Sequence, residues 1–374
     1  MLSKFGKSDG GRETWFYNFF PMLVESGGIK SNVFGFRINS EENNEGVMLD
    51  HFISKDKIKP HLLVSSQVKY PRFFRMFFLL RKLLKKEELQ KPDVTVSMGI
   101  FELVIMLYIL HFKHSKKVVW LRGIFLHEKA NRIPNFLIPL LQKFELYLLK
   151  RADVVLTNGD DLTKHYRDLG IQSIVIKNGV NTTKWKCKQR KIGKKILIAY
   201  VGRLKKEKGV EFFFKLIDYV SRSDYVDNFE FHIIGDSTSY SNDVVKYKKR
   251  SNVIDHGEIS NDYLPQLLCK FDVFVALTLS LASQGGGGTS NALLEQMAAQ
   301  KVILAWDNLI YRQLLTEKSG YFAAQGSVLG LYEKLLEILY DSQQAESKAQ
   351  EAYQIALSHS IEAQVDSFKK GVLQ

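Results

Sequence analysis

The sequence is poor in cysteine and has no long apolar run. Only two cysteines, Cys187 and Cys269, occur in 374 residues, so no disulfide framework is implied and we expect the protein in the reducing cytoplasm. The first residues, MLSKFGKSDGG, lack the apolar core of a secretory signal. The longest apolar stretch, residues 100–112, contains Glu102 and is shorter than the roughly 20 residues that span a bilayer. We therefore expect it to form a core helix.

Acidic residues are scarce in the first half of the chain. The whole sequence has a net charge of +13, from 53 Lys and Arg against 40 Asp and Glu. Residues 1–190 contain 32 of these cations and 18 of these anions, a net charge of +14, and the remainder is nearly neutral. This asymmetry indicates that the first half meets an anionic partner, such as nucleic acid, a phosphorylated acceptor or an acidic membrane.

The chain length and the apolar pattern predict two α/β domains. Short β-branched runs alternate with helical patterns, and near-continuous apolar strands between helices are typical of parallel sheets covered on both faces. Two such series in 374 residues favour two doubly wound, Rossmann-like domains over a barrel. The expected strands are residues 32–38, 61–66, 93–99, 116–123, 153–158 and 173–179, then 194–203, 229–236, 252–258, 272–277, 301–307 and 319–323.

A polar, basic connector at residues 181–195 marks the expected boundary between the domains. We assign residues 1–190 to the first domain and 191–345 to the second. Residues 346–374 are expected to form a C-terminal helix that packs back on the first domain. Little apolar sequence precedes Gly10 and Gly11, so either the first strand is very short or the true start of the chain lies upstream. We favour a short strand at Leu2–Phe5.

The stretch YVGRLKKEKGVEFF places cations directly after a predicted strand. Gly202 permits a sharp turn, and Arg203 and Lys208 precede a helix that begins at about Val210. Ligands of open α/β sheets bind at the carboxyl ends of strands, where a guanidinium and an ammonium group suit a diphosphate. The alternative interpretation is that both are solvated loop charges.

The stretch GGGGTSNALLEQMAAQ predicts a second anion site. Gly285–Gly288 lead into a helix that Thr289 or Ser290 can cap, and free backbone N–H groups at a helix N-terminus bind phosphate. Glu295, one turn further, can accept hydrogen bonds from ribose hydroxyls. The alternative is a flexible loop followed by a surface glutamate, but the neighbouring residues read as core elements.

Five further stretches follow in a fixed order with these two. They are residues 10–20 (GGRETWFYNFF), 152–166 (ADVVLTNGDDLTKHY), 176–181 (IKNGVN), 232–236 (HIIGD) and 255–259 (DHGEI). In this order and spacing the set resembles the retaining glycosyltransferases of family four, which have the GT-B fold. The resemblance covers nearly the whole chain.

The resemblance implies a role for individual residues. Arg203 and Lys208 would bind the diphosphate of a nucleotide sugar and stabilise the leaving phosphate, and Glu295 would hold the ribose. The remaining donor-side residues would be Gly11, Gly202, Gly257, Glu258, Gly287, Gly288, Thr289, Ser290 and Asn291. Gly10, Arg122 and Asn178 would lie on the acceptor side. No covalent nucleophile, metal or cofactor is implied, because the cations supply the charge that Mg²⁺ supplies elsewhere.

Two positions depart from the family pattern. Gly287 stands where the family has a glutamate that touches the donor sugar, so backbone N–H groups, Gln284 or Asn291 would have to contact it. Arg122 stands where the family often has a histidine, and it either faces an anion or forms a structural ion pair. His127 nearby is expected to be a loop residue.

Residues 71–91 combine a cationic and an apolar side. An amphipathic helix of this kind can lie in an anionic membrane interface, although a packed helix with a solvated basic side is the alternative. The one-sided charge favours the membrane. The residues concerned are Arg72, Phe73, Phe74, Arg75, Phe77, Phe78, Arg81, Lys82, Lys85 and Lys86.

We therefore expect a metal-independent retaining glycosyltransferase that uses a UDP- or GDP-sugar in surface polysaccharide or glycolipid assembly. Its acceptor would be a saccharide or a lipid-linked molecule, and it would lie peripherally on the inner face of the plasma membrane. An epimerase-type or non-catalytic GT-B relative is the alternative. Nucleic-acid binding is disfavoured, because the first half has no zinc spacing, no aromatic RNA-binding signature and no basic tail.

Overall fold

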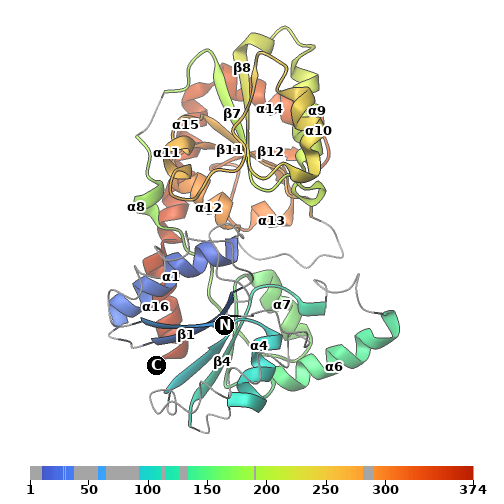
Figure 1. The fold of residues 1–374 in the computed structure, drawn as a ribbon. Coiled ribbons are helices and arrows are strands. Elements are labelled where there is room, and N and C mark those ends of the chain that lie inside the picture. The colour runs from blue at the N-terminus through green and yellow to red at the C-terminus, as the bar shows by residue number, and fades with distance from the viewer. Residues whose placement is uncertain are drawn as a thin grey trace. The chain divides into compact units, whose positions relative to one another are not determined.

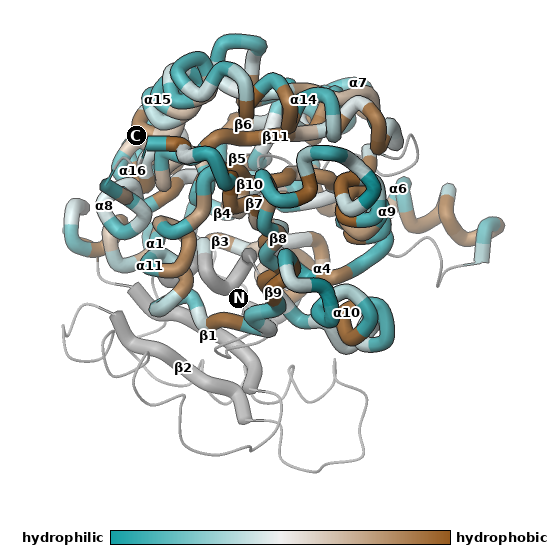
Figure 2. The backbone as a smooth tube through the Cα atoms, turned by 90° about the horizontal axis from the view of Figure 1, so that it is seen from above, coloured by the Kyte–Doolittle hydropathy of each residue, from teal (hydrophilic) through white to brown (hydrophobic). Residues whose placement is uncertain are grey.

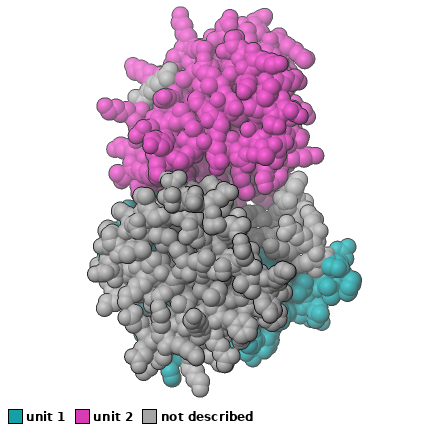
Figure 3. Space-filling model, in the orientation of Figure 1, with its two compact units in different colours: residues 1–178, 283–288, 361–374 teal, residues 179–282, 289–360 magenta. Residues whose placement is uncertain are grey.

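The computed structural model describes residues 11–27, 29, 31–37, 58–64, 92–110, 114–126, 134–188, 191–280 and 290–373. These residues form two compact units (Figures 1 and 3). Unit 1 holds the described residues up to Asn178 and those from Ile361, and unit 2 holds those from Gly179 to Ser360. The first boundary therefore follows residue 178, not residue 190, because helix α8 (Thr182–Trp185) packs against α12 (Asn291–Ala298) within unit 2.

Unit 2 is built on one parallel sheet of six strands in the order β12-β11-β10-β7-β8-β9 (Figure 1). All six strands expected in this region are confirmed. The order reverses between β7 and β10, which are adjacent in the sheet but are separated by β8 and β9 in the chain. The strands are β7 (Ile196–Val201), β8 (Phe229–Ile234), β9 (Val253–Asp255), β10 (Val273–Ala276), β11 (Val302–Asp307) and β12 (Tyr321–Ala324).

Helices of unit 2 bury the sheet, which explains its nearly uniform apolar strands. Helix α9 (Val210–Val220) packs with α14 (Val328–Tyr340), and α12 packs with α15 (Ser342–Ser358), which also contacts β11. Strand β10 is buried at every residue. The shorter helices are η5 (Lys206–Lys208), η6 (Val226–Asn228), η7 (Thr238–Tyr240), α10 (Ser241–Tyr247), α11 (Leu264–Leu268) and α13 (Leu309–Arg312).

Unit 1 contains a parallel sheet in the order β3-β4-β5-β6 and a separate parallel pair, β1 and β2. The six strands expected here are present, and the expected stub at Leu2–Phe5 lies outside the described residues. The strands are β1 (Ser31–Arg37), β2 (Ile58–Val64), β3 (Val94–Ser97), β4 (Lys116–Leu121), β5 (Val154–Thr157) and β6 (Ile174–Val175). The helices are α1 (Gly11–Gly27), α4 (Ile100–Ile105), η2 (Met106–Leu110), η4 (Asn135–Leu137), α6 (Ile138–Leu149), α7 (Asp160–Asp168) and α16 (Ile361–Val372).

The last helix completes the core of unit 1. Helix α16 packs on α1, where the indole N–H of Trp15 donates to Gln364 Oε1 at 2.9 Å. Phe368 stacks on Trp120 of β4, with ring centroids 5.3 Å apart. The return to unit 1 begins at Ile361, whereas the preceding helix α15 belongs to unit 2.

The apolar stretch at residues 100–112 is a core helix, as expected. It runs as α4 and continues as one π-helical turn, η2, with Leu103, Ile105 and Met106 buried. In the described part of the chain, no helix combines the length and apolar character needed to cross a bilayer.

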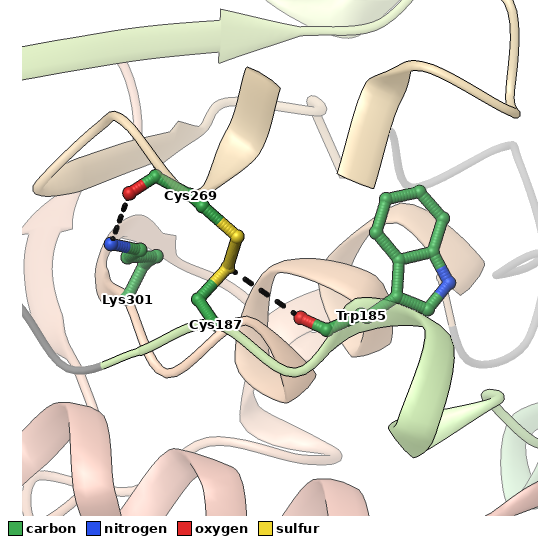
Figure 4. Close-up of a disulfide and its surroundings, with 4 residues drawn as sticks. All are labelled: Trp185, Cys187, Cys269 and Lys301. Atoms are coloured by element: carbon green, nitrogen blue, oxygen red, sulfur yellow. Dashed lines mark hydrogen bonds between the residues drawn. A yellow bond between two sulfur atoms is a disulfide. The ribbon is translucent and has the colours of Figure 1, made fainter. Parts of the chain in front are cut away.

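The two cysteines form a disulfide bond, which corrects the expectation from the sequence (Figure 4). Cys187 follows α8, and Cys269 ends α11. Their Cα atoms lie 5.3 Å apart although 82 residues separate them in the chain. The pairing depends on how α8 and α11 pack in unit 2, so a count of two cysteines could not reveal it.

Candidate functional site

The strand order of unit 2 locates a candidate site between β7 and β10. In open parallel sheets, ligands bind outside the carboxyl ends of the strands, at the point where the strand order reverses. Arg203 and Lys208 follow β7, and the chain after β10 leads to α12. The topology therefore brings Arg203, Lys208 and the start of α12 to the same edge of the same sheet.

The loop after β7 is held in place by backbone hydrogen bonds to the loop after β8. The N–H of Gly202 donates to Ile234 O at 2.9 Å, and the N–H of Leu204 donates to Asp236 O at 3.1 Å. Beneath the loop, the Tyr200 hydroxyl lies 3.2 Å from the carbonyl oxygen of Lys208, to which it donates. Burial raises the pKa of Tyr200, so this hydroxyl keeps its proton.

Two glycines allow these loops to approach closely. A Cβ atom on Gly235 would lie 2.0 Å from Gly202 O, and one on Gly209 would lie 2.0 Å from Leu277 O. Gly209 also has a φ of 72°, a conformation that favours glycine. The start of α9 therefore rests directly on the chain that leaves β10.

The chain leaving β10 is anchored by buried aromatic side chains. The indole N–H of Trp306 donates to Leu277 O at 3.0 Å, and the N–H of Thr278 donates to the Tyr311 hydroxyl oxygen at 2.7 Å. These bonds fix the backbone that leads towards α12.

Two polar side chains that sequence reasoning missed add to this anchor. Asn308 Nδ2 donates to Thr278 O at 3.1 Å, and Gln325 Oε1 accepts from the N–H of Ser280 at 2.8 Å. In the sequence, Asn308 comes directly after the buried strand β11, and Gln325 comes directly after β12. A polar residue at the end of a buried strand is the signal that could have indicated each of them.

Arg203 and Lys208 form a pair of cations whose charges interact. Arg203 is exposed and Lys208 is half-buried. Burial lowers the pKa of Lys208, the nearby charge of Arg203 lowers it further, and the charge of Glu207 partly opposes this shift. Neither side chain forms a salt bridge with any residue that the structure describes. A bound anion would relieve both the mutual repulsion and the cost of burying the ammonium group.

Helix α12 presents a capped N-terminus and a half-buried carboxyl group. Ser290 is the N-cap residue, and its Oγ accepts from the N–H of Leu293 at 3.4 Å. Glu295 lies one turn further along, where burial raises its pKa to about 8 and the charge of Lys184 partly opposes this shift. Hydroxyl groups that donate hydrogen bonds to the carboxylate would stabilise its charged form and offset the free-energy cost of burying it.

The loop after β9 lies next to the loop after β8. The N–H of Gly235 donates to Gly257 O at 2.8 Å, and Glu258 beyond it is exposed. His256 is hydrogen-bonded to His232, with 3.0 Å between Nε2 and Nδ1. Burial lowers the pKa of His232 to about 4, so this supporting pair stays neutral near pH 7.

In unit 1, the structure brings Arg122, Asn178 and the beginning of α1 together. The Arg122 guanidinium lies 4.0 Å from the centroid of the Trp15 ring and donates to Asn178 Oδ1 at 2.9 Å. Trp15 is one turn from Gly11, the first residue of α1. The ring of Trp15 and the side-chain amide of Asn178 thus hold the Arg122 guanidinium. That Arg122 binds an anionic donor or acceptor stays a prediction.

Several predicted site residues lie outside the described residues. These are Gly10, Gly287, Gly288, Thr289 and the cationic apolar segment from Arg72 to Lys86, together with His127 and Gln284. Asn291 is described as the first residue of α12. Within the described ranges, no group of three or more His, Cys, Asp or Glu side chains is arranged to hold a metal ion.

Two family models match the chain over adjoining ranges. Residues 10–184 match the model described as Glycosyltransferase Family 4, and residues 181–355 match the model described as Glycosyl transferases group 1. The matched ranges meet near the boundary between the two units.

One curated relative is an uncharacterized 41.2 kDa protein in the cps region of Klebsiella pneumoniae. It is 31% identical over 142 residues, and this match spans 35% of the present chain and 38% of the relative.

Solved glycosyltransferase structures share the fold over almost the whole chain. Anabaena Alr3699/HepE in complex with UDP and glucose has a TM-score of 0.73 at 14% identity, covering 99% of this chain and 98% of that one. Sucrose-phosphate synthase of Thermosynechococcus elongatus has a TM-score of 0.73 at 13% identity, with 99% and 96% covered. The apo form of the lipopolysaccharide outer core galactosyltransferase WaaB has a TM-score of 0.69 at 16% identity, with 99% and 97% covered. At these identities the likeness shows the fold.

Replacing Gly209 should disturb the contact between the start of α9 and the chain leaving β10. We expect Gly209→Ala to lower the free energy of unfolding by roughly 2–4 kcal/mol, because its Cβ would overlap Leu277 O at a positive φ. Gly326→Ala is the matched control, since its φ is also positive (90°) but its Cβ would meet only Phe212 at 3.9 Å. Urea unfolding of both variants measures the difference, and equal losses would contradict the assigned contact.

The raised pKa of Glu295 predicts a pH-dependent stability. A pKa above the ordinary value means that the folded state holds the proton more tightly, so this group destabilises the fold as pH rises from about 4.5 towards 8. We expect Glu295→Gln to match the parent protein at pH 5 and to melt at least about 3 °C higher at pH 8.5.

Thermal unfolding across this pH range provides the measurement. Exposed Glu258→Gln serves as the control and should show no such trend. A melting difference for Glu295→Gln that stays constant with pH would show that the carboxyl group is not held in a desolvated position.

Proposed function

Because the chain belongs to the glycosyltransferases of family 4 and group 1, we propose that it transfers a sugar from a nucleotide sugar to a saccharide or lipid-linked acceptor, with retention of anomeric configuration. The observation that carries this proposal is the pair of cations Arg203 and Lys208, which lie at the reversal of strand order in unit 2 and form no salt bridge with a described residue. A diphosphate is the ligand that this pair and the capped start of α12 suit best.

Each part of the donor has a matching group at this edge of the sheet. Arg203 and Lys208 bind the diphosphate, and backbone N–H groups at the start of α12 supply further donors. Glu295 accepts hydrogen bonds from the ribose hydroxyls, which offset the cost of its burial. Gly257 and Glu258 border the nucleobase.

The proposed reaction needs charge stabilisation more than a protein nucleophile. The acceptor hydroxyl oxygen forms a bond to C1 of the sugar while the bond from C1 to the diphosphate oxygen breaks on the same face. The nucleoside diphosphate leaves with the electron pair, and one of its phosphate oxygens takes the hydroxyl proton. Arg203 and Lys208 neutralise the charge that develops on this leaving group.

Because Gly287 has no side chain, other groups must contact the donor sugar. We assign these contacts to backbone N–H groups before α12 and to Asn291, the first residue of that helix. A site that reads the sugar through few side chains should discriminate weakly between hexoses. No cofactor or metal is part of this proposal.

The proposed setting is the assembly of a surface polysaccharide or glycolipid. Its support is the relative in the cps region of Klebsiella pneumoniae and the fold shared with WaaB, a lipopolysaccharide outer core galactosyltransferase. A UDP-hexose is the first donor to test, because HepE has been crystallised with UDP-glucose. We place the enzyme peripherally on an anionic membrane. The Cys187–Cys269 disulfide removes the low cysteine count as an argument for the reducing cytoplasm, so we assign the enzyme to no particular face of that membrane.

Loss of either cation should abolish most of the turnover. We expect Arg203→Ala and Lys208→Ala each to lower kcat/KM by roughly 10²–10³, the usual effect of removing a group that stabilises charge in the transition state. Lys206→Ala is the matched control, because Lys206 is an exposed cation of the same loop.

The donor is first identified by thermal shift against a panel of UDP- and GDP-sugars, since a ligand that binds the folded state raises its melting temperature. Calorimetry then gives its affinity, and release of nucleoside diphosphate gives turnover. Full activity of both variants would contradict the assigned roles. Donor binding by the parent protein without turnover of any acceptor tested would favour a non-catalytic relative.

A further inference from the structure

Helix α6 and the short helix η4 that leads into it expose a row of large apolar side chains. Phe136, Leu140, Phe144 and Tyr147 are 79%, 64%, 46% and 47% exposed, although a typical helix buries such residues. They are three or four residues apart and thus lie on one side of the helix, which we call the α6 apolar face. Figure 2 shows most of α6 in brown, the colour of hydrophobic residues. The opposite side buries Glu145, Leu148 and Leu149.

The neighbouring helix extends this surface. Helix α4 packs on α6, and Tyr108 of the adjoining η2 is hydrogen-bonded to Tyr147. Tyr108 is 44% exposed, and Phe101, two helical turns earlier, is 43% exposed. The apolar surface therefore spans two packed elements rather than one helix.

Between Asn135 and Arg151, a segment that the structure describes in full, every exposed charged residue is positive. Lys143, Lys150 and Arg151 are exposed, and the Arg151 guanidinium lies 4.7 Å from the centroid of the Tyr147 ring. The single acid of this segment, Glu145, is buried and accepts a hydrogen bond from the Tyr166 hydroxyl at 2.7 Å. Burial raises the pKa of Glu145, and the hydrogen bond from Tyr166 partly opposes this shift. Lys143, Lys150 and Arg151 therefore border the α6 apolar face with positive charge.

Among the described residues of unit 2, exposed apolar side chains are scattered over separate elements. Tyr263 before α11, Leu309 of α13 and Leu329 of α14 are examples. Single exposed apolar residues are ordinary, whereas a contiguous group marks an interaction surface.

We propose that the α6 apolar face, with Phe101 and Tyr108, inserts into the interface of an anionic lipid bilayer. Phenylalanine and leucine side chains at this depth replace water contacts with acyl chains, and tyrosines are typical of the headgroup level. Lys143, Lys150 and Arg151 then meet lipid phosphates. A second copy of the chain fits less well, because a two-fold contact through this face would bring like charges together.

This inference deepens the proposed function by naming the surface through which the enzyme reaches a lipid-linked acceptor. The role of the surface in reaching the acceptor rests on the proposed function, whereas the binding of the surface to lipid does not. It is independent of the cationic segment from Arg72 to Lys86. Vesicle binding is measured without donor or acceptor, so failure to bind lipid and failure to transfer sugar are separate results.

The test is flotation of the full chain with vesicles of phosphatidylcholine alone or mixed equally with phosphatidylglycerol, at about 0.1 M salt. We expect flotation only with the mixed vesicles. The double variant Leu140→Asp with Phe144→Asp should reduce the bound fraction roughly tenfold, since two buried apolar contacts are lost. Leu329→Asp, an equally drastic change at an exposed leucine of unit 2, should float as the parent does.

A variant without the three cations tests whether the α6 apolar face binds anionic lipid rather than another partner. Replacing Lys143, Lys150 and Arg151 by glutamine should weaken the preference for anionic vesicles, while circular dichroism confirms the fold. Equal binding of the parent protein to both vesicle types, or unchanged flotation of the double variant, would overturn the proposal. So would a parent dimer, detected by light scattering, that the double variant converts to a monomer.

Discussion

The close approach of three loops at one edge of the unit 2 sheet is the constraint on which the candidate site depends. Gly235 lies against Gly202 O, and Gly209 lies against Leu277 O, at distances that exclude a Cβ atom. These contacts join the chain after β7 to the chains after β8 and β10. Backbone groups thereby hold Arg203 and Lys208 at the reversal of strand order, and the two cations need no acidic partner to position them.

This arrangement stores unfavourable electrostatic energy that a ligand can release. Lys208 is half-buried beside another cation, and Glu295 is held where its charged form is disfavoured. Both features cost stability in the free protein, as expected of groups arranged for binding rather than for folding. A diphosphate compensates the first cost and ribose hydroxyls the second. A single nucleotide sugar bound to unit 2 would therefore offset both the repulsion at Lys208 and the cost of burying the Glu295 carboxylate.

Local patterns and long-range packing differ in how far the sequence reveals them. The strands of both units could be predicted, because parallel strands covered on both faces are continuous apolar runs. Arg203 and Lys208 could be located because a strand ends just before them. The disulfide of Cys187 and the contact of Gly209 with Leu277 could not, since each depends on strand order and helix packing. Likewise, the spacing of α6 indicates its apolar side but not whether that side is covered.

A crystal structure of the protein soaked with a panel of nucleoside diphosphate sugars tests the central claim most directly. The account predicts that the diphosphate oxygens accept hydrogen bonds from Arg203 and Lys208, with the ribose hydroxyls at Glu295. A diphosphate bound elsewhere, or a crevice that stays empty at saturating concentrations of every donor, would contradict it.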